Sequence, residues 1–401
     1  MTILHVITRL ILGGAQLNTV MSCRAQVAAG HEVHLAYGPI FGPEGSLLEE
    51  ARASGATLHE VGSLVRELSP RKDVRCVGEL RRLVRELRPD VVHSHSSKAG
   101  ILTRAAAWRE TQRAGFWAYA ADMTLGDERI VHTVHGLPWD DTQAWWRRRL
   151  YVGLERWAAK RCHHVVAITP QMVDAFVDAK VAPREKFTVI PSGVEVADFA
   201  PVPRQRDAVR ARYGIPADAA VVGHVGRLDR LKGHADLLDV LPQLDAGGRD
   251  VWLLFVGDGF DRAAVEARPQ FASGRAVITG RVDADAVPAH LAAMDVTALP
   301  SYQEGQSRTL VEALLCETPV VGYATGGIPD VVRDGVTGRL AATGDRDALA
   351  AALNATLADP AGSRAMAAAG RADVAERFSA ERMNRELLTL YGRLVRDVPA
   401  D

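Results

Sequence analysis

The chain has 401 residues, carries a net charge of −1 at pH 7, and is 47% hydrophobic with only 6% aromatic residues. This length exceeds one typical domain and suits two of roughly 200 residues each. A charge so close to zero gives no ground for a nucleic-acid partner, and we expect none. The composition, with alternating strand-like and helix-like stretches, indicates a globular α/β protein.

Four cysteines are scattered along the chain without a C-x-x-C pair. This spacing fits a reducing compartment and argues against a disulfide scaffold or a structural zinc site. No run of about 18 apolar residues occurs, and the N-terminus enters a strand directly rather than a signal peptide. We therefore expect a cytoplasmic protein, with peripheral contact at the inner face of a membrane left open.

The first predicted unit is a strand at residues 3–7, a glycine turn containing Gly13 and Gly14, a helix to about Ala28, and a strand at 33–36. This is a Rossmann-like βαβ unit. Its turn is not G-x-G-x-x-G, and no acidic residue follows the second strand. The pattern therefore argues against a dinucleotide-dependent dehydrogenase.

Residues 74–88 predict a helix with one apolar face and one arginine-rich face. Such a helix can rest on an anionic membrane, but it is more often an ordinary surface helix. Residues 140–161 combine three tryptophans with consecutive arginines, which is typical of membrane interfaces and equally of a helix that buries aromatic residues between layers. We favour the second interpretation. The strand at 165–168 is expected to complete the first sheet.

Histidines follow or occupy two predicted strands. The strand at 130–134 ends in His135 and a glycine, and a histidine at the carboxyl end of a parallel strand is well placed to meet a ligand. His93, His95 and His132 are expected to be structural or to support the site from behind.

The pattern divides the chain into residues 1–195, 196–380 and a final helix at 381–401. Residues 187–195 predict a hinge, and the Pro- and Arg-rich stretch 201–216 a crossing between domains. The second domain opens with a strand that ends in Gly226 and Arg227, with Lys232 five residues after the arginine. Two cations at a strand-to-helix turn can neutralise a diphosphate and stabilise it as a leaving group.

Residues 300–327 form the most informative stretch. They predict a loop after a buried strand, then a helix from about Thr309 to Cys316, and then another strand. Glu304 lies in the loop and Glu312 about one turn inside the helix. Free backbone amides and the helix dipole at such a helix start favour an anionic ligand.

This E-x7-E spacing, followed by E-A, P-V-V and G-G, resembles the signature of the retaining glycosyltransferases of family 4, and in particular the bacterial group 1 enzymes of surface polysaccharide biosynthesis. The resemblance covers nearly the whole chain. It implies the GT-B architecture, in which two Rossmann-like, doubly wound parallel-sheet domains face a central cleft. It further implies that the first domain binds the acceptor and the second the nucleotide-sugar.

The resemblance also implies roles for single residues. The Gly14 backbone would approach the donor diphosphate or the acceptor, His135 and Glu304 would hold the transferred sugar, and Glu312 the donor ribose. The implied catalytic set is Glu304, His135, Arg227 and Lys232, and the implied donor-binding set is Gly14, Arg227, Lys232, Gly257, Val282, Glu304, Gln306, Ser307, Arg308 and Glu312. Gln306, Ser307 and Arg308 depart from the commoner aromatic-Gly-aliphatic residues, so the donor-sugar contacts are expected to differ.

The function implied is transfer of a sugar from a UDP- or GDP-sugar to a hydroxyl acceptor, either a saccharide or a lipid-linked saccharide. Residues 96–100 (S-S-K-A-G) resemble a loop of members that use lipid carriers. No DXD-type metal site is evident, since Asp140 and Asp141 fit a helix start, and we expect neither a metal nor another cofactor. Two alternatives stay open: a GT-B nucleotide-sugar epimerase and a non-catalytic subunit that binds nucleotide-sugar.

Overall fold

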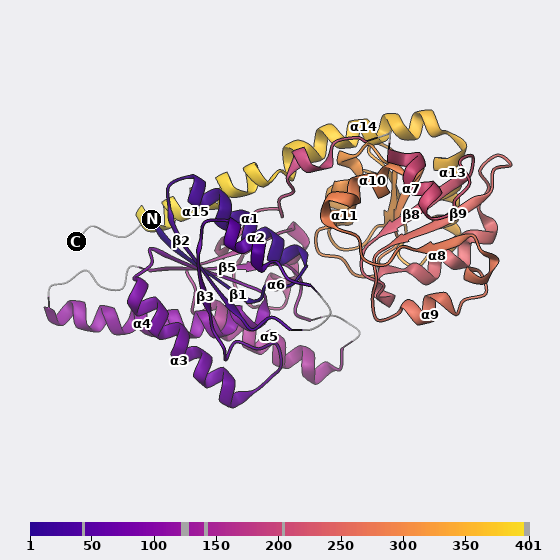
Figure 1. Ribbon diagram of the computed structural model, residues 1–401. Helices are drawn as coiled ribbons and strands as arrows, with labels where there is room; N and C mark the ends of the chain where they lie inside the picture. The colour runs from indigo at the N-terminus through magenta and orange to yellow at the C-terminus, as the bar shows by residue number, and fades with distance from the viewer. Residues whose placement is uncertain (42–44, 122–127, 140–142, 203–204, 397–401) are drawn as a thin grey trace. The chain divides into compact units, whose positions relative to one another are not determined.

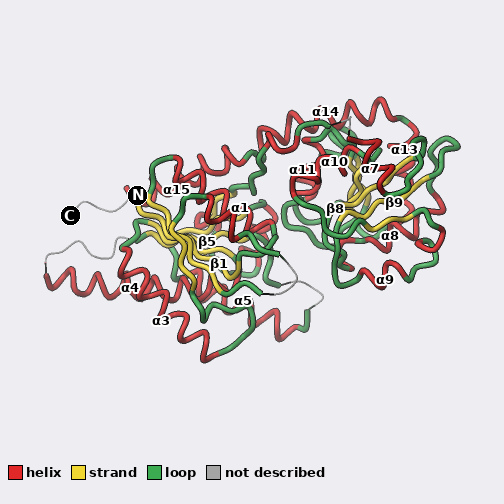
Figure 2. Tube along the Cα trace, in the orientation of Figure 1, coloured by secondary structure: helices red, strands yellow, loops and turns green. Residues whose placement is uncertain are grey.

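The computed structural model describes residues 1–41, 45–121, 128–139, 143–202 and 205–396. The chain divides into two compact units, of which the first comprises Met1–Gly193 and Ala380–Asp401 and the second Val194–Ser379. Figure 2 shows that each unit contains its own sheet with helices packed around it.

The described residues of the first unit form a parallel seven-stranded sheet. In sheet order its strands are β3 (Thr57–Glu60), β2 (Glu32–Gly38), β1 (Thr2–Arg9), β4 (Val91–His95), β5 (Arg129–Val134), β6 (His164–Ala167) and β7 (Phe187–Val189). Nearly every position of β1, β2 and β4 is buried. Both faces of the sheet are therefore covered, so these strands do not alternate between buried apolar and exposed polar residues, and polar side chains such as His5, His93 and His95 are themselves buried.

Helices cover both faces of this sheet, with α1 on one side and α3 and α4 on the other (Figure 1). The helical segments are α1 (Gly14–Ala28), α2 (Leu48–Ala53), α3 (Pro70–Leu87), α4 (Ser97–Ala121), α5 (Trp145–Ala159), α6 (Pro170–Asp178), η1 (Arg184–Lys186) and α15 (Ala380–Arg396).

The last helix, α15, belongs to the first unit although its residues lie at the other end of the chain. Its strongly amphipathic sequence places Met383, Leu387, Leu390 and Tyr391 in a buried cluster with residues of β1, β4 and β5, such as Ile3. Burying an apolar side chain of this size is worth roughly 1.5–3 kcal/mol, so α15 is a substantial part of this core.

The described residues of the second unit form a parallel six-stranded sheet. In sheet order its strands are β10 (Ala276–Ile278), β9 (Val251–Val256), β8 (Ala220–Val225), β11 (Val296–Leu299), β12 (Val320–Tyr323) and β13 (Arg339–Ala341). Its helices are η2 (Val196–Phe199), α7 (Arg206–Arg212), η4 (Arg230–Lys232), α8 (His234–Val240), η5 (Leu241–Gln243), α9 (Arg262–Glu266), η6 (Phe271–Ser273), η7 (Ala284–Ala286), α10 (Val287–Ala292), α11 (Arg308–Leu315), α12 (Ile328–Val331), α13 (Arg346–Ala358) and α14 (Pro360–Arg377).

Both sheets have the strand order of doubly wound Rossmann-like folds, so the predicted α/β fold class with two Rossmann-like domains is confirmed. In this order the second and third strands lie on one side of the first strand, and the fourth and later strands lie on its other side. The place between the first and fourth strands, where the order reverses, is the switch point. Ligands of such sheets bind at the carboxyl ends of the strands near this point. The switch point lies between β1 and β4 in the first unit and between β8 and β11 in the second.

Two expectations about the first unit are wrong. The strand at 165–168 does not complete the sheet, because β7 pairs in parallel with β6 and adds a further strand within residues assigned to the hinge. The tryptophans at 140–161 are not buried between layers: Trp145 is 73% exposed, Trp146 51% and Trp157 39%. Helix α5 instead buries its C-terminal part through Glu155, Ala158 and Ala159, which leaves its aromatic N-terminal turns outside the core.

The basic helix α3 behaves as a surface helix whose arginines are partly used inside the unit. Its buried face carries Cys76, Leu80 and Val84. Arg81 Nε lies 2.5 Å from a carboxylate oxygen of Glu110 on α4, and a second arginine of α3 binds the same carboxylate. Among the described helices, none combines the length and apolar content needed to cross a membrane.

Candidate functional site

The loops that follow β8, β9, β11 and β12 meet at the carboxyl edge of the second sheet. Backbone hydrogen bonds join them: Leu228 N donates to Asp258 O at 3.0 Å, and Tyr302 N donates to Leu231 O at 2.8 Å. The loops after four different strands therefore form one connected layer at the edge where the fold places ligands.

Two glycines allow this close approach. Gly257 has φ of 140°, and a Cβ there would overlap the carbonyl oxygen of Gly226. Gly326 has φ of 51°, and a Cβ there would overlap the carbonyl oxygen of Glu304. Because any side chain would push these loops apart, both positions require glycine.

An ion pair lies at the switch point of this sheet. Lys232 follows β8, Glu304 follows β11, and the Lys232 Nζ lies 2.6 Å from Glu304 Oε2. The side chains are only 24% and 12% exposed, so the pair is largely shielded from water. Sequence reasoning gave the two residues separate roles, toward the diphosphate and toward the sugar. The structure brings their charged groups into direct contact.

Arg227 lies in the same loop as Lys232 but is more exposed, and its guanidinium stands 3.5 Å from an Asp229 carboxylate oxygen. This is a loose pair at the surface, where ion pairs contribute little to stability. The Arg227 side chain is therefore only weakly held, which is compatible with a cation that is recruited by an anionic ligand.

The helix α11 begins at the same edge. The buried Ser307 hydroxyl accepts a hydrogen bond from Leu310 N at 3.3 Å and caps the helix, and the Thr309 hydroxyl donates to Val225 O at the end of β8, at 3.1 Å. These bonds fix the positive end of the helix dipole beside the loop that carries the two cations. Gln306 precedes the cap and is also buried.

Glu312 lies one turn into α11, with Arg308 Nη2 at 3.3 Å from its Oε1. Burial raises the pKa of Glu312, and the charge and hydrogen bond of Arg308 oppose this shift. Arg308, which departs from the family pattern, thus acts on a carboxylate that sequence reasoning had already assigned to the donor. Val282 packs partly buried against the core of this unit.

Sequence reasoning missed Asp236 on α8. Its buried carboxylate accepts hydrogen bonds from the hydroxyls of Tyr302 at 2.7 Å and Tyr323 at 2.8 Å, and pairs with Arg346 Nε at 3.0 Å. Tyr302 is two residues before Glu304, so Asp236 anchors the loop that presents the glutamate. These partners are far apart in the sequence, and no motif connects them.

The other two predicted residues belong to the first unit. Gly14 begins α1 after the carboxyl end of β1, and His135 follows β5 at the same edge of the sheet. The His135 Nε2 lies 3.1 Å from His95 Nδ1, and burial lowers the pKa of His135 to about 4, so its ring is neutral at pH 7. Asp140 and Asp141 lie outside the described residues.

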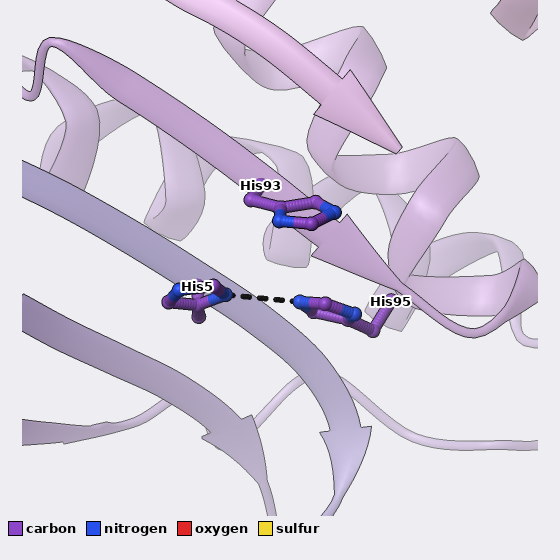
Figure 3. Close-up of side chains that lie close together, drawn as sticks. All are labelled: His5, His93 and His95. Atoms are coloured by element: carbon purple, nitrogen blue, oxygen red, sulfur yellow. Dashed lines mark hydrogen bonds between the residues drawn. The ribbon is translucent and has the colours of Figure 1, made fainter. Parts of the chain in front are cut away.

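His5, His93 and His95 form a buried cluster between β1 and β4 (Figure 3). One ring nitrogen from each of the three histidines lies within 4.8 Å of the other two, which is close enough for all three to bind one metal ion. The His5 Nδ1 and His95 Nε2 atoms are also hydrogen bonded at 2.9 Å. Of the three histidines expected to be structural or supporting, His93 and His95 are thus in contact with each other and with His5. The third, His132, lies on β5 with its Nδ1 at 3.0 Å from Ser94 Oγ.

A cavity of about 360 Å³ lies at the opposite edge of the second unit. Its lining includes Asp295 and Pro319, which precede β11 and β12, and Arg206. None of the predicted site residues lines it.

Comparison with known families covers both units. Residues 205–373 match the family described as Glycosyl transferases group 1. Residues 12–198 match Glycosyltransferase Family 4.

Named relatives support the same assignment. A 2-deoxystreptamine glucosyltransferase from Streptomyces kanamyceticus is 32% identical over 249 residues, which span 61% of this chain and 64% of that protein. A 2-deoxystreptamine N-acetyl-D-glucosaminyltransferase from Streptomyces fradiae is 32% identical over 311 residues, spanning 76% of this chain and 71% of that protein.

Among solved structures, Anabaena HepE in complex with UDP-glucose has a TM-score of 0.79 at 23% identity, covering 98% of this chain and 100% of that one. Sucrose-phosphate synthase from Thermosynechococcus elongatus has a TM-score of 0.77 at 22% identity, covering 99% of this chain and 100% of that one. At these identities the likeness establishes the fold.

Proposed function

We propose that this chain, which belongs to family 4 of the glycosyltransferases, moves a sugar from a nucleoside-diphosphate donor onto a hydroxyl with retention of configuration. The observation that carries the proposal is the shielded Lys232–Glu304 ion pair at the switch point of the second sheet, beside the N-terminus of α11. The complexes of HepE with UDP and UDP-glucose support a nucleotide-sugar ligand.

The chemistry proposed is stabilisation of a leaving group. As the bond between the sugar's anomeric carbon and the diphosphate breaks, the acceptor oxygen bonds to that carbon and the acceptor's proton passes to the leaving diphosphate, on which negative charge has developed. Lys232, the exposed Arg227 and the helix dipole of α11 favour this charge most strongly in the transition state, which is the condition for catalysis. Glu304 would then hold the sugar, whose ring becomes oxocarbenium-like, while His135 stays a predicted sugar contact.

The pair has a further use in this scheme. In the free protein, Glu304 neutralises Lys232, so the site carries less uncompensated positive charge than two free cations would. When a diphosphate arrives, the ammonium can turn toward it and Glu304 becomes free to accept hydrogen bonds from sugar hydroxyls. Donor binding would therefore replace one ion pair by two new polar contacts, at a small net electrostatic cost.

We further propose that no divalent ion is required, because the cationic side chains supply the charge that Mg²⁺ would otherwise provide. Turnover should persist in excess EDTA. Loss of turnover in EDTA, restored by Mg²⁺ or Mn²⁺, would contradict this part of the proposal.

The acceptor proposed is a lipid-linked saccharide. The aromatic N-terminal turns of α5 are exposed and lie among consecutive arginines, and tryptophan with arginine suits the boundary between lipid headgroups and water. A soluble acceptor is the alternative suggested by the names of the two Streptomyces relatives, both of which include 2-deoxystreptamine.

The decisive experiment has two stages. First, thermal unfolding is followed with UDP, GDP, ADP and their common sugars, since a ligand at 100 times its Kd stabilises the native state by about 2.7 kcal/mol. The donor so identified is then incubated with candidate acceptors, and the product is examined by NMR for its anomeric configuration. A retained linkage supports the proposal; an altered nucleotide-sugar formed without acceptor, or no response to any nucleotide, contradicts it.

A further inference from the structure

A chain of hydrogen bonds runs through the interior of the first unit and ends at His135. Gln26 Oε1, on α1, lies 2.8 Å from His5 Nε2. His5 Nδ1 lies 2.9 Å from His95 Nε2, the contact drawn in Figure 3. His95 Nδ1 lies 3.1 Å from His135 Nε2. Gln26, His5 and His95 are all buried, so water does not compete for these bonds.

Gln26, at the end of the chain farthest from His135, determines which atom is the donor and which the acceptor in every hydrogen bond of the chain. Burial lowers the pKa of His5 to about 4 and holds that of His95 well below its usual range, so the rings are neutral and each has one N–H and one lone pair. The Gln26 carbonyl oxygen can only accept, which places the His5 proton on Nε2. His5 Nδ1 must then accept from His95 Nε2, and His95 Nδ1 must accept from His135 Nε2.

We propose that Gln26, His5 and His95 are positioning residues that hold His135 in the tautomer protonated at Nε2, leaving the Nδ1 lone pair to accept a hydrogen bond from a hydroxyl of the transferred sugar. The His135 Nδ1 atom is buried and has no hydrogen-bond partner among the described residues. A buried polar atom without a partner costs about 1–3 kcal/mol, and a ligand hydroxyl would recover this cost. The identity of the ligand rests on the proposed function; the tautomer of His135 does not.

The geometry favours this chain over a metal site built from the same histidines. Two nitrogen ligands at about 2.0–2.1 Å from a tetrahedral Zn²⁺ stand roughly 3.3 Å apart, whereas His5 Nδ1 and His95 Nε2 are 2.9 Å apart. The two ring nitrogens of His93 are occupied by the hydroxyls of Tyr391 and Thr133. Both ring nitrogens of His5, His93 and His95 thus already take part in hydrogen bonds.

The tautomer is tested directly by NMR of the full chain labelled with ¹⁵N-histidine, which reports which ring nitrogen carries the proton. We expect His135 to be protonated at Nε2 alone. In His95→Leu the acceptor is lost and His135 should become a mixture of tautomers. In His95→Asn the amide oxygen replaces Nδ1 and should restore the Nε2 tautomer.

A matched control comes from the same strand. His93→Leu removes an equally buried ring that bonds to Tyr391 and Thr133, so it should weaken the fold without changing the tautomer of His135. If His95→Leu does not fold, Gln26→Leu can be used instead. It removes the acceptor for His5 Nε2, and His135 should again become a mixture of tautomers. Protonation of wild-type His135 at Nδ1, or one stoichiometric Zn²⁺ held by the histidines in the purified protein, would overturn the proposal.

Kinetics separate this inference from the proposed function. With the donor identified above, kcat/KM should fall about tenfold to a hundredfold in His95→Leu, as expected for a lost and unsatisfied hydrogen bond, and recover within a few-fold in His95→Asn. Unchanged kcat/KM in a His95→Leu protein whose tautomer is mixed would overturn the sugar contact. If the wild-type protein transfers no sugar, the proposed function fails, and the NMR result still decides whether His135 is held in one tautomer.

Discussion

Replacing Lys232 by methionine tests whether its charge serves catalysis rather than folding. Met keeps most of the length of the side chain and removes the ammonium. If this charge stabilises the leaving diphosphate, kcat should fall by a factor of about 10² to 10³, the usual cost of losing one donor that acts on charge in the transition state. The variant also leaves the Glu304 carboxylate without its partner at 2.6 Å.

The second effect is a loss of stability. An unpaired carboxylate that is only 12% exposed costs about 1–3 kcal/mol, which corresponds to a decrease of several degrees in Tm for a unit of this size. The double variant Lys232→Met/Glu304→Gln removes the unpaired charge. It should regain most of the lost stability while its turnover stays low.

The assay combines initial rates of transfer with thermal unfolding of the same preparations. Arg230→Ala provides a control, because Arg230 is an exposed residue of the same short helix, η4, and should change neither quantity much. Near-wild-type turnover in folded Lys232→Met would refute the leaving-group role. Recovery of turnover together with stability in the double variant would show that the lysine serves the fold alone.

The remaining predictions concern other parts of the molecule. Asp236→Asn should raise KM for the donor several-fold and lower Tm, because Tyr302 loses the acceptor that anchors its loop; unchanged steady-state kinetics would contradict the anchor. Acidification from pH 6.5 toward 4 should destabilise the first unit, because His5 binds a proton in the unfolded state but not when it is buried. The free energy of unfolding should fall by roughly 3 kcal/mol near pH 4. Urea unfolding at several pH values should show a free energy of unfolding that depends less on pH in His5→Gln than in the wild type. Trp145→Ser/Trp146→Ser should reduce flotation with vesicles rich in anionic lipid and leave that with neutral vesicles unchanged; equal flotation of variant and wild type with anionic vesicles would contradict the lipid contact.

The parts of the fold that could be predicted from the sequence are those with strong local signals. The strand, loop and helix around Glu304 were placed to within about a residue, because Pro300 and Ser307 mark the ends of regular structure and the apolar spacing of α11 is unambiguous. The same local signals placed Lys232 and Glu304 after two strands. They did not reveal that the two charges touch, because strand order is a property of the whole sheet.

Other features depended on packing that local patterns do not encode. The aromatic residues of α5 fit burial and exposure equally well, and only the position of the helix on the unit decided between them. The strand β7 has only three residues and precedes a Pro-Ser-Gly turn, a local pattern that indicates a hinge rather than a strand. A signal for the histidine chain did exist, since His93 and His95 alternate on one face of β4 and His5 pairs with His93 in register.

The placement of α15 has a consequence for how the protein is made. The second unit is one uninterrupted segment, Val194–Ser379, and can fold as soon as it leaves the ribosome. The first unit must wait for its last helix while this segment is translated, roughly 10 to 40 s at 5–20 residues per second. During that time, the apolar surface that α15 later covers, around Ile3, Val91 and Val131, is open to solvent. This nascent chain is thus a natural client for chaperones, and a protein cut before residue 380 should aggregate through that surface.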